Sequence, residues 1–330
     1  MFTFIEINVI RVYLRMNKIL VTGGAGFIGS AIAEKLILDK NNYVVIVDDL
    51  STGMDGKLPK LPKDNWKFIK CDVNEYSEIS QVFLSHSFDY VFHYAALVGV
   101  LRTQQYPVKV LKDIDGLKFV CQLSKNTGVK RVFFSSSSEI YGEPVEIPQN
   151  AHTTPLNSRL PYAIVKNVGE AFLRSYNQEF GLNYTIFRFF NTYGPKQSRD
   201  FVMSKFIAKA LKNEDIGVYG DGSQTRTFCY YEDNIDACLK AFTDNLLIND
   251  VVNIGGNVET TILELANLII SITGSKSKIV HLPPLKDGDM TRRCPDNSTM
   301  KQVLLKRDLV PLEVGIKKIL EKGLFELNMD

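Results

Sequence analysis

The stretch "VTGGAGFIGS", residues 21–30, decides the fold of this 330-residue chain. It follows the short apolar run 18–22 and opens the helix-like stretch "SAIAEKLIL". Because glycine has no side chain, such a turn can tighten and bring its backbone close to a pyrophosphate, whose charge then meets the amide groups at the helix N-terminus. We therefore predict a dinucleotide site here, with a tight turn that binds nothing as the alternative. The expected contacts are Gly23, Gly26, Phe27, Ile28 and Gly29.

Five more apolar runs follow, over residues 43–47, 66–69, 90–94, 131–134 and 184–189. They are continuous rather than alternating, as strands buried on both faces must be, and helix-length stretches separate them. The pattern predicts an α/β fold, a Rossmann-type, doubly wound parallel sheet.

The rhythm changes after "NTYGP", residues 191–195, where a helical stretch leads into the glycine-rich "YGDGSQTRTF" and then a mixture of short strands and helices. We predict a dinucleotide-binding domain over 16–190, to which 228–256 returns, and a smaller mixed α/β substrate-binding lobe over 191–330. Residues 1–15 are expected to be an N-terminal extension. A ligand would then lie between the lobes, beyond the carboxyl ends of the strands.

The composition is that of an ordinary soluble protein, with 45% hydrophobic and 23% charged residues. The 39 basic and 37 acidic side chains are spread without long runs of one sign, so no nucleic-acid or membrane partner is expected. The five cysteines include no Cys-x-x-Cys pair, so we expect neither a metal site nor disulfides, and a cytoplasmic location. Glu6 and Arg11 interrupt the apolar N-terminus, which argues against a signal peptide or membrane anchor.

The second apolar run ends in "VDDLSTG", which places Asp48 about twenty residues beyond the glycines. A carboxylate there can accept hydrogen bonds from an adenosine ribose and would repel a 2'-phosphate, so NAD is favoured over NADP. Asp72, after the third run, would suit an adenine contact. For both residues the alternative is a capped turn.

Tyr162 and Lys166 in "YAIVK" lie four residues apart, so on a helix they share one face. The ammonium group is expected to lower the pKa of the phenol and so to prepare it for proton transfer. Taken alone, this spacing more often marks a solvated helix face.

The glycine turn, Asp48, the serine-rich "FFSSSSEIYGE" (133–143) and the Tyr162/Lys166 pair occur in this order, and together they resemble the extended short-chain dehydrogenase/reductases that act on nucleotide sugars. Further matches are "YAALVGV", "RFFNTYGP", "YGDGSQTRTF" and "GDMTRR", so the resemblance extends from residue 18 onward. It implies that the chain uses NAD and binds a nucleotide sugar.

The resemblance also implies roles for single residues. Ser137 would hydrogen-bond the sugar oxygen that is oxidised, Tyr162 would be the base at that hydroxyl, and Lys166 would also bind the nicotinamide ribose. Further cofactor contacts would be Val73, Ala95, Ala96 and Phe189. Substrate contacts would be Arg102, Asn191, Val202, Arg226 and Arg292, with Arg226 and Arg292 on the diphosphate. Where the family usually has an Asn in the helix after the fourth strand, this chain has Asp113.

Glu139 bears on the reaction type. Simple epimerases of this family generally have no carboxylate there, whereas 4,6-dehydratases and decarboxylating enzymes do. The Ser137-Ser138-Glu139 order resembles GDP-mannose dehydratases, and the wider sequence is similar to the GDP-N-acetylglucosamine 4,6-dehydratases of bacterial legionaminic acid synthesis. A dehydratase would oxidise C4, remove the C5 hydrogen with Glu139, expel the C6 hydroxyl with a proton from Ser138 or Glu139, and return hydride to C6.

Two other reactions and one binding role stay open. A UDP-glucuronate decarboxylase would need a cation near the sugar carboxylate, which Arg102 could provide, and a C4 epimerase would use the same scaffold. A catalytically silent NAD-binding sensor is the alternative from another class. The stretches 110–125 and 160–180 carry more apolar surface than one buried face needs, and the resemblance implies a homodimer through a four-helix bundle; the alternative is that both only pack on the sheet.

Overall fold

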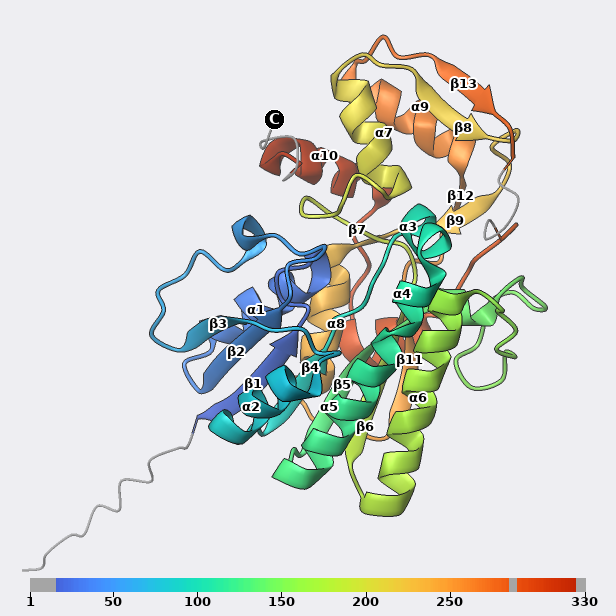
Figure 1. Cartoon of the computed structure of the whole chain (residues 1–330). Helices are drawn as coiled ribbons and strands as arrows, with labels where there is room; N and C mark the ends of the chain where they lie inside the picture. Colours follow the sequence, from blue (N-terminus) through green and yellow to red (C-terminus); the bar gives the residue numbers. More distant parts are fainter. Residues whose placement is uncertain (1–15, 285–289, 325–330) are drawn as a thin grey trace, which may run out of the picture.

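The computed structural model describes residues 16–284 and 290–324, so the predicted extension at 1–15 lies outside the described residues (Figure 1). Seven parallel strands form one sheet in the order β11-β6-β5-β4-β1-β2-β3. The strands are β1 (Asn17–Thr22), β2 (Asn42–Asp48), β3 (Trp66–Lys70), β4 (Tyr90–His93), β5 (Arg131–Ser137), β6 (Asn183–Phe189) and β11 (Asp250–Ile254). The predicted doubly wound, Rossmann-type parallel sheet is confirmed.

Helices cover both faces of this sheet. One face carries α2 (Tyr76–His86), α5 (Asp113–Thr127) and α6 (Pro161–Phe180), and the other carries α1 (Phe27–Leu38) and α8 (Tyr231–Thr243). Successive residues of a strand point to opposite faces. In β1, Leu20 accordingly packs with the α2/α5/α6 core, whereas Ile19 and Val21 pack with the α1/α8 core. Burial on both sides explains why the strand sequences are continuously apolar.

The chain crosses between its two lobes more than once. After β6 it forms the short β7 (Thr192–Tyr193) and enters the smaller lobe, and it returns through β10 (Cys229–Tyr230), which pairs with β7. It then adds α8 and β11 to the larger lobe, where β11 pairs with β6 in the register Val252 to Phe187.

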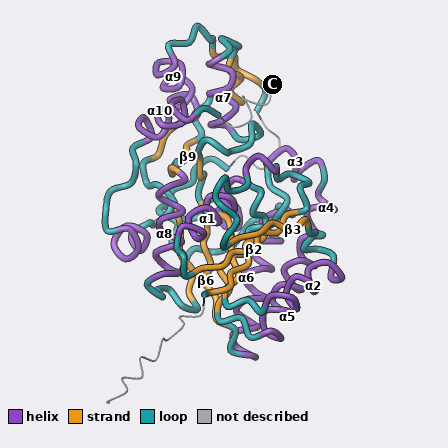
Figure 2. The backbone as a smooth tube through the Cα atoms, turned by 90° about the vertical axis from the view of Figure 1, so that its left-hand side faces the viewer, coloured by secondary structure: helices purple, strands orange, loops and turns teal. Residues whose placement is uncertain are grey.

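The smaller lobe packs its own core above the carboxyl ends of the strands, as two views show (Figures 1 and 2). It contains α7 (Val202–Leu211), β8 (Ile216–Tyr219), β9 (Thr225–Thr227), β12 (Glu259–Thr261), α9 (Ile262–Thr273), β13 (Ile279–Leu282) and α10 (Leu312–Lys322). Thr261 starts α9, because its side chain accepts from the Glu264 amide while Glu264 caps the Thr261 amide in return.

Shorter elements complete the fold. These are α3 (Val100–Gln105), α4 (Pro107–Leu111), the 3-10 turns η1 (Asp55–Lys57) and η2 (Ser138–Tyr141), and the π-helical η3 (Met300–Leu305). All five cysteines are buried and free. Within 16–284 and 290–324, no helix combines the length and hydropathy that a membrane crossing requires.

Candidate active site

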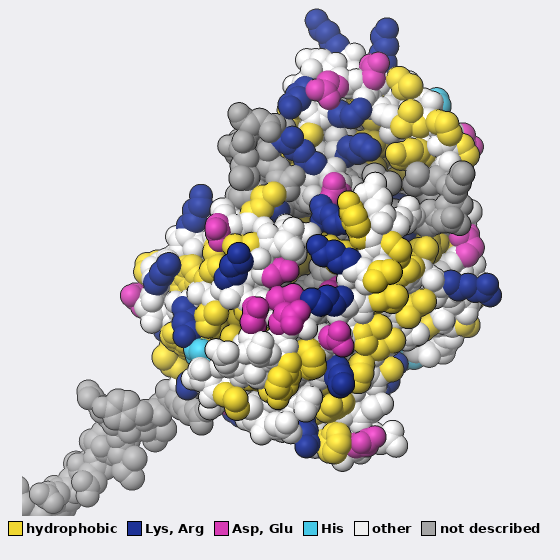
Figure 3. Space-filling model, viewed as in Figure 1, with side chains coloured by type: hydrophobic (Ala, Val, Ile, Leu, Met, Phe, Trp, Pro, Cys, Tyr) yellow, Lys and Arg dark blue, Asp and Glu magenta, His cyan; other side chains and the backbone are white. Residues whose placement is uncertain are grey.

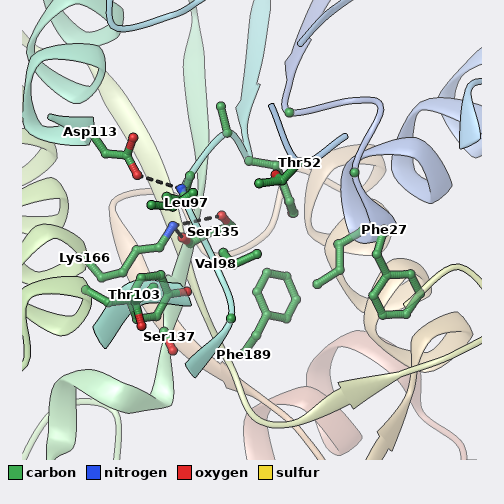
Figure 4. A pocket seen from close by; sticks show the side chains of 18 of the residues that line it. Phe27, Thr52, Leu97, Val98, Thr103, Asp113, Ser135, Ser137, Lys166 and Phe189 are labelled. Atoms are coloured by element: carbon green, nitrogen blue, oxygen red, sulfur yellow. Dashed lines mark hydrogen bonds between the residues drawn. The ribbon is translucent and has the colours of Figure 1, made fainter. Parts of the chain in front are cut away.

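A cavity of about 710 Å³ lies where the carboxyl edge of the sheet meets the smaller lobe. Figure 4 shows side chains of the larger lobe, among them Phe27, Ser137 and Lys166, around this cavity. The predicted residues that line it are Gly23, Gly26, Phe27, Ile28, Gly29, Asp48, Asp72, Val73, Ala95, Ala96, Ser137, Ser138, Glu139, Tyr162, Lys166, Phe189, Asn191 and Val202. The structure thus gathers residues from eight separate stretches of sequence into one site.

The glycine turn leaves only backbone facing this cavity. Gly23 has φ +68°, and a Cβ built on it would lie 2.6 Å from the Ala95 nitrogen. A Cβ on Gly29 would lie 2.2 Å from the Gly23 carbonyl oxygen. Side chains are therefore excluded at Gly23 and Gly29, and this backbone cradle at the start of α1 fits a pyrophosphate, as a bound NAD would require.

We expect Gly29→Ala to weaken NAD binding by roughly ten- to a hundredfold, because the new methyl group forces the turn to shift. Isothermal titration calorimetry measures the dissociation constant. Lys35→Ala, on the exposed side of the same helix, is the matched control and should bind NAD normally. An unchanged affinity in the Gly29 variant would remove the cradle from the cofactor site.

Asp48 ties the end of β2 to the glycine turn. Its Oδ2 accepts from the Ala25 amide and its Oδ1 from the Leu50 amide, both at 2.9 Å. Burial raises the pKa of this carboxyl group, while the two amide bonds oppose the shift. Each carboxylate oxygen has a second lone pair, so the group can still accept from a ribose hydroxyl.

Asp72 caps a turn and also lies in the cavity wall, and its contact with adenine stays a prediction. Its Oδ1 accepts from the Asn74 amide at 2.9 Å, which caps the turn after β3, and the residue also lines the cavity. Lys112 lies 3.7 Å from its other oxygen.

The catalytic candidates meet at the end of β5 and the start of α6. Ser137 Oγ accepts from the Glu139 amide at 3.1 Å and so begins η2. Pro161 occupies the first turn of α6 and fixes the entry of the helix, which points Tyr162 toward Ser137. The two side chains share a hydrogen bond.

Lys166 lies one turn further along α6 and is buried. Its Nζ donates to the Ser135 carbonyl at 2.7 Å and lies 5.7 Å from the centre of the Tyr162 ring. Burial lowers the pKa of Lys166 to about 8, against the opposing charge of Asp113. A buried cation next to a half-buried phenol is an arrangement suited to proton transfer.

Lys166 was expected to lower the pKa of Tyr162, but the protein around Tyr162 raises this pKa. Burial raises the pKa of Tyr162, the charge of Glu139 raises it further, and the hydrogen bond from Ser137 opposes both. Helix spacing reveals neither the desolvation of the phenol nor the nearby Glu139 carboxylate, and both raise the pKa.

Three predicted substrate residues do not line the cavity. Arg102 pairs with Asp200 at 2.5 Å, and Arg292 pairs with Glu259 at 2.6 Å. Arg226 is buried and donates to the carbonyls of Thr225 and Met290. Each guanidinium group is engaged by a partner outside the cavity wall, and the contacts of these residues with a sugar or diphosphate stay predictions.

The sequence analysis missed Arg293. This side chain is almost fully buried in the cavity wall, and its Nη1 lies 2.7 Å from Glu139 Oε1. Its Nη2 donates to the sulfur of Met290, whereas its Nε has no hydrogen-bond partner among the described residues. Neighbouring side chains of an extended segment point to opposite sides. The sequence alone does not say which of the two arginines points into the cavity and which points outward.

The chain matches the sequence profile of the NAD dependent epimerase/dehydratase family over residues 19–255. It belongs to this family. The cofactor of the epimerase/dehydratase family is NAD, and the glycine cradle with Asp48 fits it.

Relatives in the epimerase/dehydratase family differ in reaction. UDP-glucuronic acid decarboxylase 1 of Danio rerio is 35% identical over 315 residues, 92% of this chain and 72% of that protein. UDP-N-acetyl-alpha-D-glucosaminuronate decarboxylase of Bacillus cytotoxicus is 34% identical over 319 residues, 92% of this chain and 97% of that protein. The Thermotoga maritima UDP-glucose 4-epimerase crystal structure with UDP-glucose superimposes with a TM-score of 0.87 at 34% identity, over 95% of this chain and all of that one. None of these three is a GDP-N-acetylglucosamine 4,6-dehydratase, the group expected from the resemblance.

Proposed function

We propose that this protein is an NAD-dependent nucleotide-sugar lyase that oxidises C4 of the sugar and then releases a group at C6. The observation that carries this proposal is the ion pair between the half-buried Glu139 and the buried Arg293, beside Ser137 and Tyr162. An epimerase only removes and returns a hydride at C4, and it needs no ionised pair next to that carbon. A reaction at C5 or C6 does need groups that hold charge or move a proton there.

The first step uses the Ser137–Tyr162–Lys166 group. NAD, when bound, supplies the hydride acceptor. Ser137 and Tyr162 hydrogen-bond the C4 hydroxyl, and Tyr162 takes its proton. Lys166, held by the Ser135 carbonyl, provides a positive charge that favours the phenolate.

Oxidation prepares the second step. A ketone at C4 acidifies the hydrogen on C5, and it makes a C6 carboxylate part of a β-keto acid, which loses carbon dioxide readily. Glu139 and Arg293 enclose this part of the cavity on the side of η2.

The substrate that we propose first is a UDP-linked sugar acid, from which carbon dioxide leaves. The Danio rerio and Bacillus cytotoxicus relatives, both decarboxylases by name, support it. Arg293 also supports it, because its Nε is unpartnered within the described chain and a guanidinium group can bind a second carboxylate beside Glu139. Arg102, proposed for this role from the sequence, pairs with Asp200 instead. After the carbon dioxide leaves, C5 takes a proton from the Glu139 side and hydride returns to C4.

The second candidate is a 4,6-dehydratase, which the Ser137-Ser138-Glu139 order favours. Here Glu139 takes the C5 proton, and the C6 hydroxyl leaves as water with a proton from Ser138 or Glu139. Hydride then returns to C6 while C5 takes a proton back from Glu139. The proposed substrate is then GDP-N-acetylglucosamine, whose base and N-acetyl group rest on the sequence resemblance alone.

Mass spectrometry of products from a panel of UDP-, GDP- and dTDP-sugars, with and without a C6 carboxylate, separates the candidates. Loss of carbon dioxide from a UDP-hexuronate is the expected result. Loss of water from a neutral donor would make the protein a dehydratase. An unchanged mass with a shifted chromatographic peak would mean epimerisation, and would leave Glu139 and Arg293 without a role at C6.

We also propose a homodimer through α5 and α6. These helices pack against each other, and Figure 3 shows hydrophobic side chains gathered over α4 and α6. The exposed residues are Tyr106, Val108, Leu111, Ile164 and Phe180. Covering such a surface by a second copy removes apolar area from water. Sedimentation equilibrium should show a dimer at micromolar concentration, and a monomer there would contradict the proposal.

A further inference from the structure

Asp113 occupies a position in the cavity wall that the reaction described above does not use. It is the first residue of α5, and it lies between the loop after β3 and the loop after β4. Figure 4 shows its carboxylate directed at the Leu97 amide, on the same side of the cavity as Lys166.

Both carboxylate oxygens of Asp113 act as acceptors. Oδ2 accepts from the Leu97 amide at 2.7 Å, and Oδ1 accepts from the Asn74 side-chain amide at 3.2 Å. The orientation of Asn74 is fixed in turn, because its own oxygen accepts from the Gly116 amide at 3.1 Å. An Asn at position 113 would have only one acceptor oxygen. Its NH2 group is a donor and would point at either the Leu97 amide or the Asn74 side-chain amide, which are donors too. The surroundings therefore select a carboxylate.

The same carboxylate is the anion whose charge acts on Lys166, through space and without a direct ion pair between the two side chains. The Lys166 ammonium group is buried, and the protein hydrogen bonds that the structure gives it run only to Ser135, which is neutral. Burial lowers the pKa of Lys166 to about 8 and Asp113 opposes this shift. His93, from β4, is the other titratable group near Lys166, and burial lowers the pKa of this histidine to about 3, so it stays neutral.

The charged groups around Asp113 and Tyr162 partly oppose one another. Burial raises the pKa of Asp113 and the charge of Asp72 adds to this, whereas the Leu97 amide and the charge of Lys166 favour the carboxylate. Glu139 and Asp113 both raise the pKa of Tyr162, whereas Arg293 lowers it. Asp113 thus acts on both members of the Tyr162/Lys166 pair.

We propose that Asp113 is a positioning residue of the active site, whose carboxylate is the counter-ion of the Lys166 ammonium group and fixes the loop after β4 through the Leu97 amide. The expected effect of this role on the reaction rate rests on the proposed function. It does not depend on which group leaves from C6.

The test is the pH profile of Asp113→Asn. Activity needs a protonated Lys166 and an ionisable Tyr162, and removing the Asp113 charge lowers the pKa of both groups. We expect both limbs of the kcat/KM profile to move to lower pH by roughly one unit. Asp113→Ser removes the same charge with a smaller side chain and is measured in parallel, so that the test does not depend on one variant folding.

Two controls separate charge from structure. Asn74→Ala removes the 3.2 Å bond but keeps the Asp113 charge, and Asp113→Glu keeps the charge on a longer side chain. If either variant loses activity, the loss should be the same at every pH. Profiles of Asp113→Asn and Asp113→Ser that superimpose on the wild type after scaling would overturn the proposal, as would a displaced profile in either control.

A readout without substrate keeps this proposal distinct from the proposed function. The absorbance of tyrosinate in the NAD complex is titrated for each protein and for its Tyr162→Phe derivative, and the difference gives the midpoint of Tyr162. A lower midpoint in the Asp113→Asn complex supports the proposal even when no nucleotide sugar is turned over. An unmoved midpoint contradicts it even when the wild-type enzyme is fully active.

Discussion

Replacing Tyr162 by Phe is expected to lower turnover by roughly a hundred- to ten-thousandfold, the range lost when a general base is removed. Tyr162 is half-buried, and its hydroxyl shares a hydrogen bond with Ser137 and is the only group on this ring that can accept the C4 proton. The ring itself packs against the α2/α5/α6 core, and Phe keeps that packing, so the fold should be retained. The measurement is the rate of NAD reduction on adding the substrate that the panel identifies.

A second tyrosine on the same helix provides the control for this prediction. Tyr176 stacks against Phe172 and Phe180, far from the cavity wall, and Tyr176→Phe should leave turnover unchanged. Equal melting temperatures of the two variants would exclude unfolding as the cause of a loss. Full activity of Tyr162→Phe would assign the base to another residue.

Glu139→Gln should separate the two halves of the reaction. Gln has nearly the same size, but it carries no charge for Arg293 and cannot take or give a proton at C5. The groups that oxidise C4 stay in place, and losing the Glu139 charge removes one cause that raises the pKa of Tyr162. We therefore expect NADH to accumulate on the enzyme, while formation of final product falls by roughly a hundred- to ten-thousandfold.

Absorbance of bound NADH and mass spectrometry of the product give the two readouts for Glu139. Glu143→Gln is the matched control, since this nearby carboxylate accepts from Thr291 outside the cavity wall. Normal product formation by Glu139→Gln would make Glu139 a structural residue. The enzyme would then catalyse C4 epimerisation only.

The main fold could be predicted from the sequence because its signals are local. Continuous apolar runs mark strands that are buried on both faces, and the glycine turn between β1 and α1 needs only the residues next to it. The same holds for Asp48, whose carboxylate binds amides within its own turn and in the glycine loop. The Tyr162/Lys166 pair is likewise set by one helix.

The part that could not be predicted depends on contacts between distant segments. Arg293 reaches Glu139 across 154 positions, and nothing near either residue specifies that contact. Arg292, Arg226 and Arg102 have suitable chemistry for binding a diphosphate or a carboxylate, but whether a guanidinium group faces the cavity depends on its partners. The sequence marks Asp113 only as a departure from the family pattern, because the donors to its carboxylate, Leu97 and Asn74, come from two other segments.

Because β11 follows β6 by about sixty residues, the edge of β6 stays unpaired during much of synthesis and in any fragment that lacks β11. Until residue 254 has left the ribosome, β6 has a neighbour on one side only, and its free edge exposes amide and carbonyl groups that can pair with another molecule. A fragment cut after residue 190 should therefore aggregate rather than fold as an independent module. Exchanging lobes between relatives to change specificity would have to transplant the loops around the cavity and leave the α8–β11 segment in place.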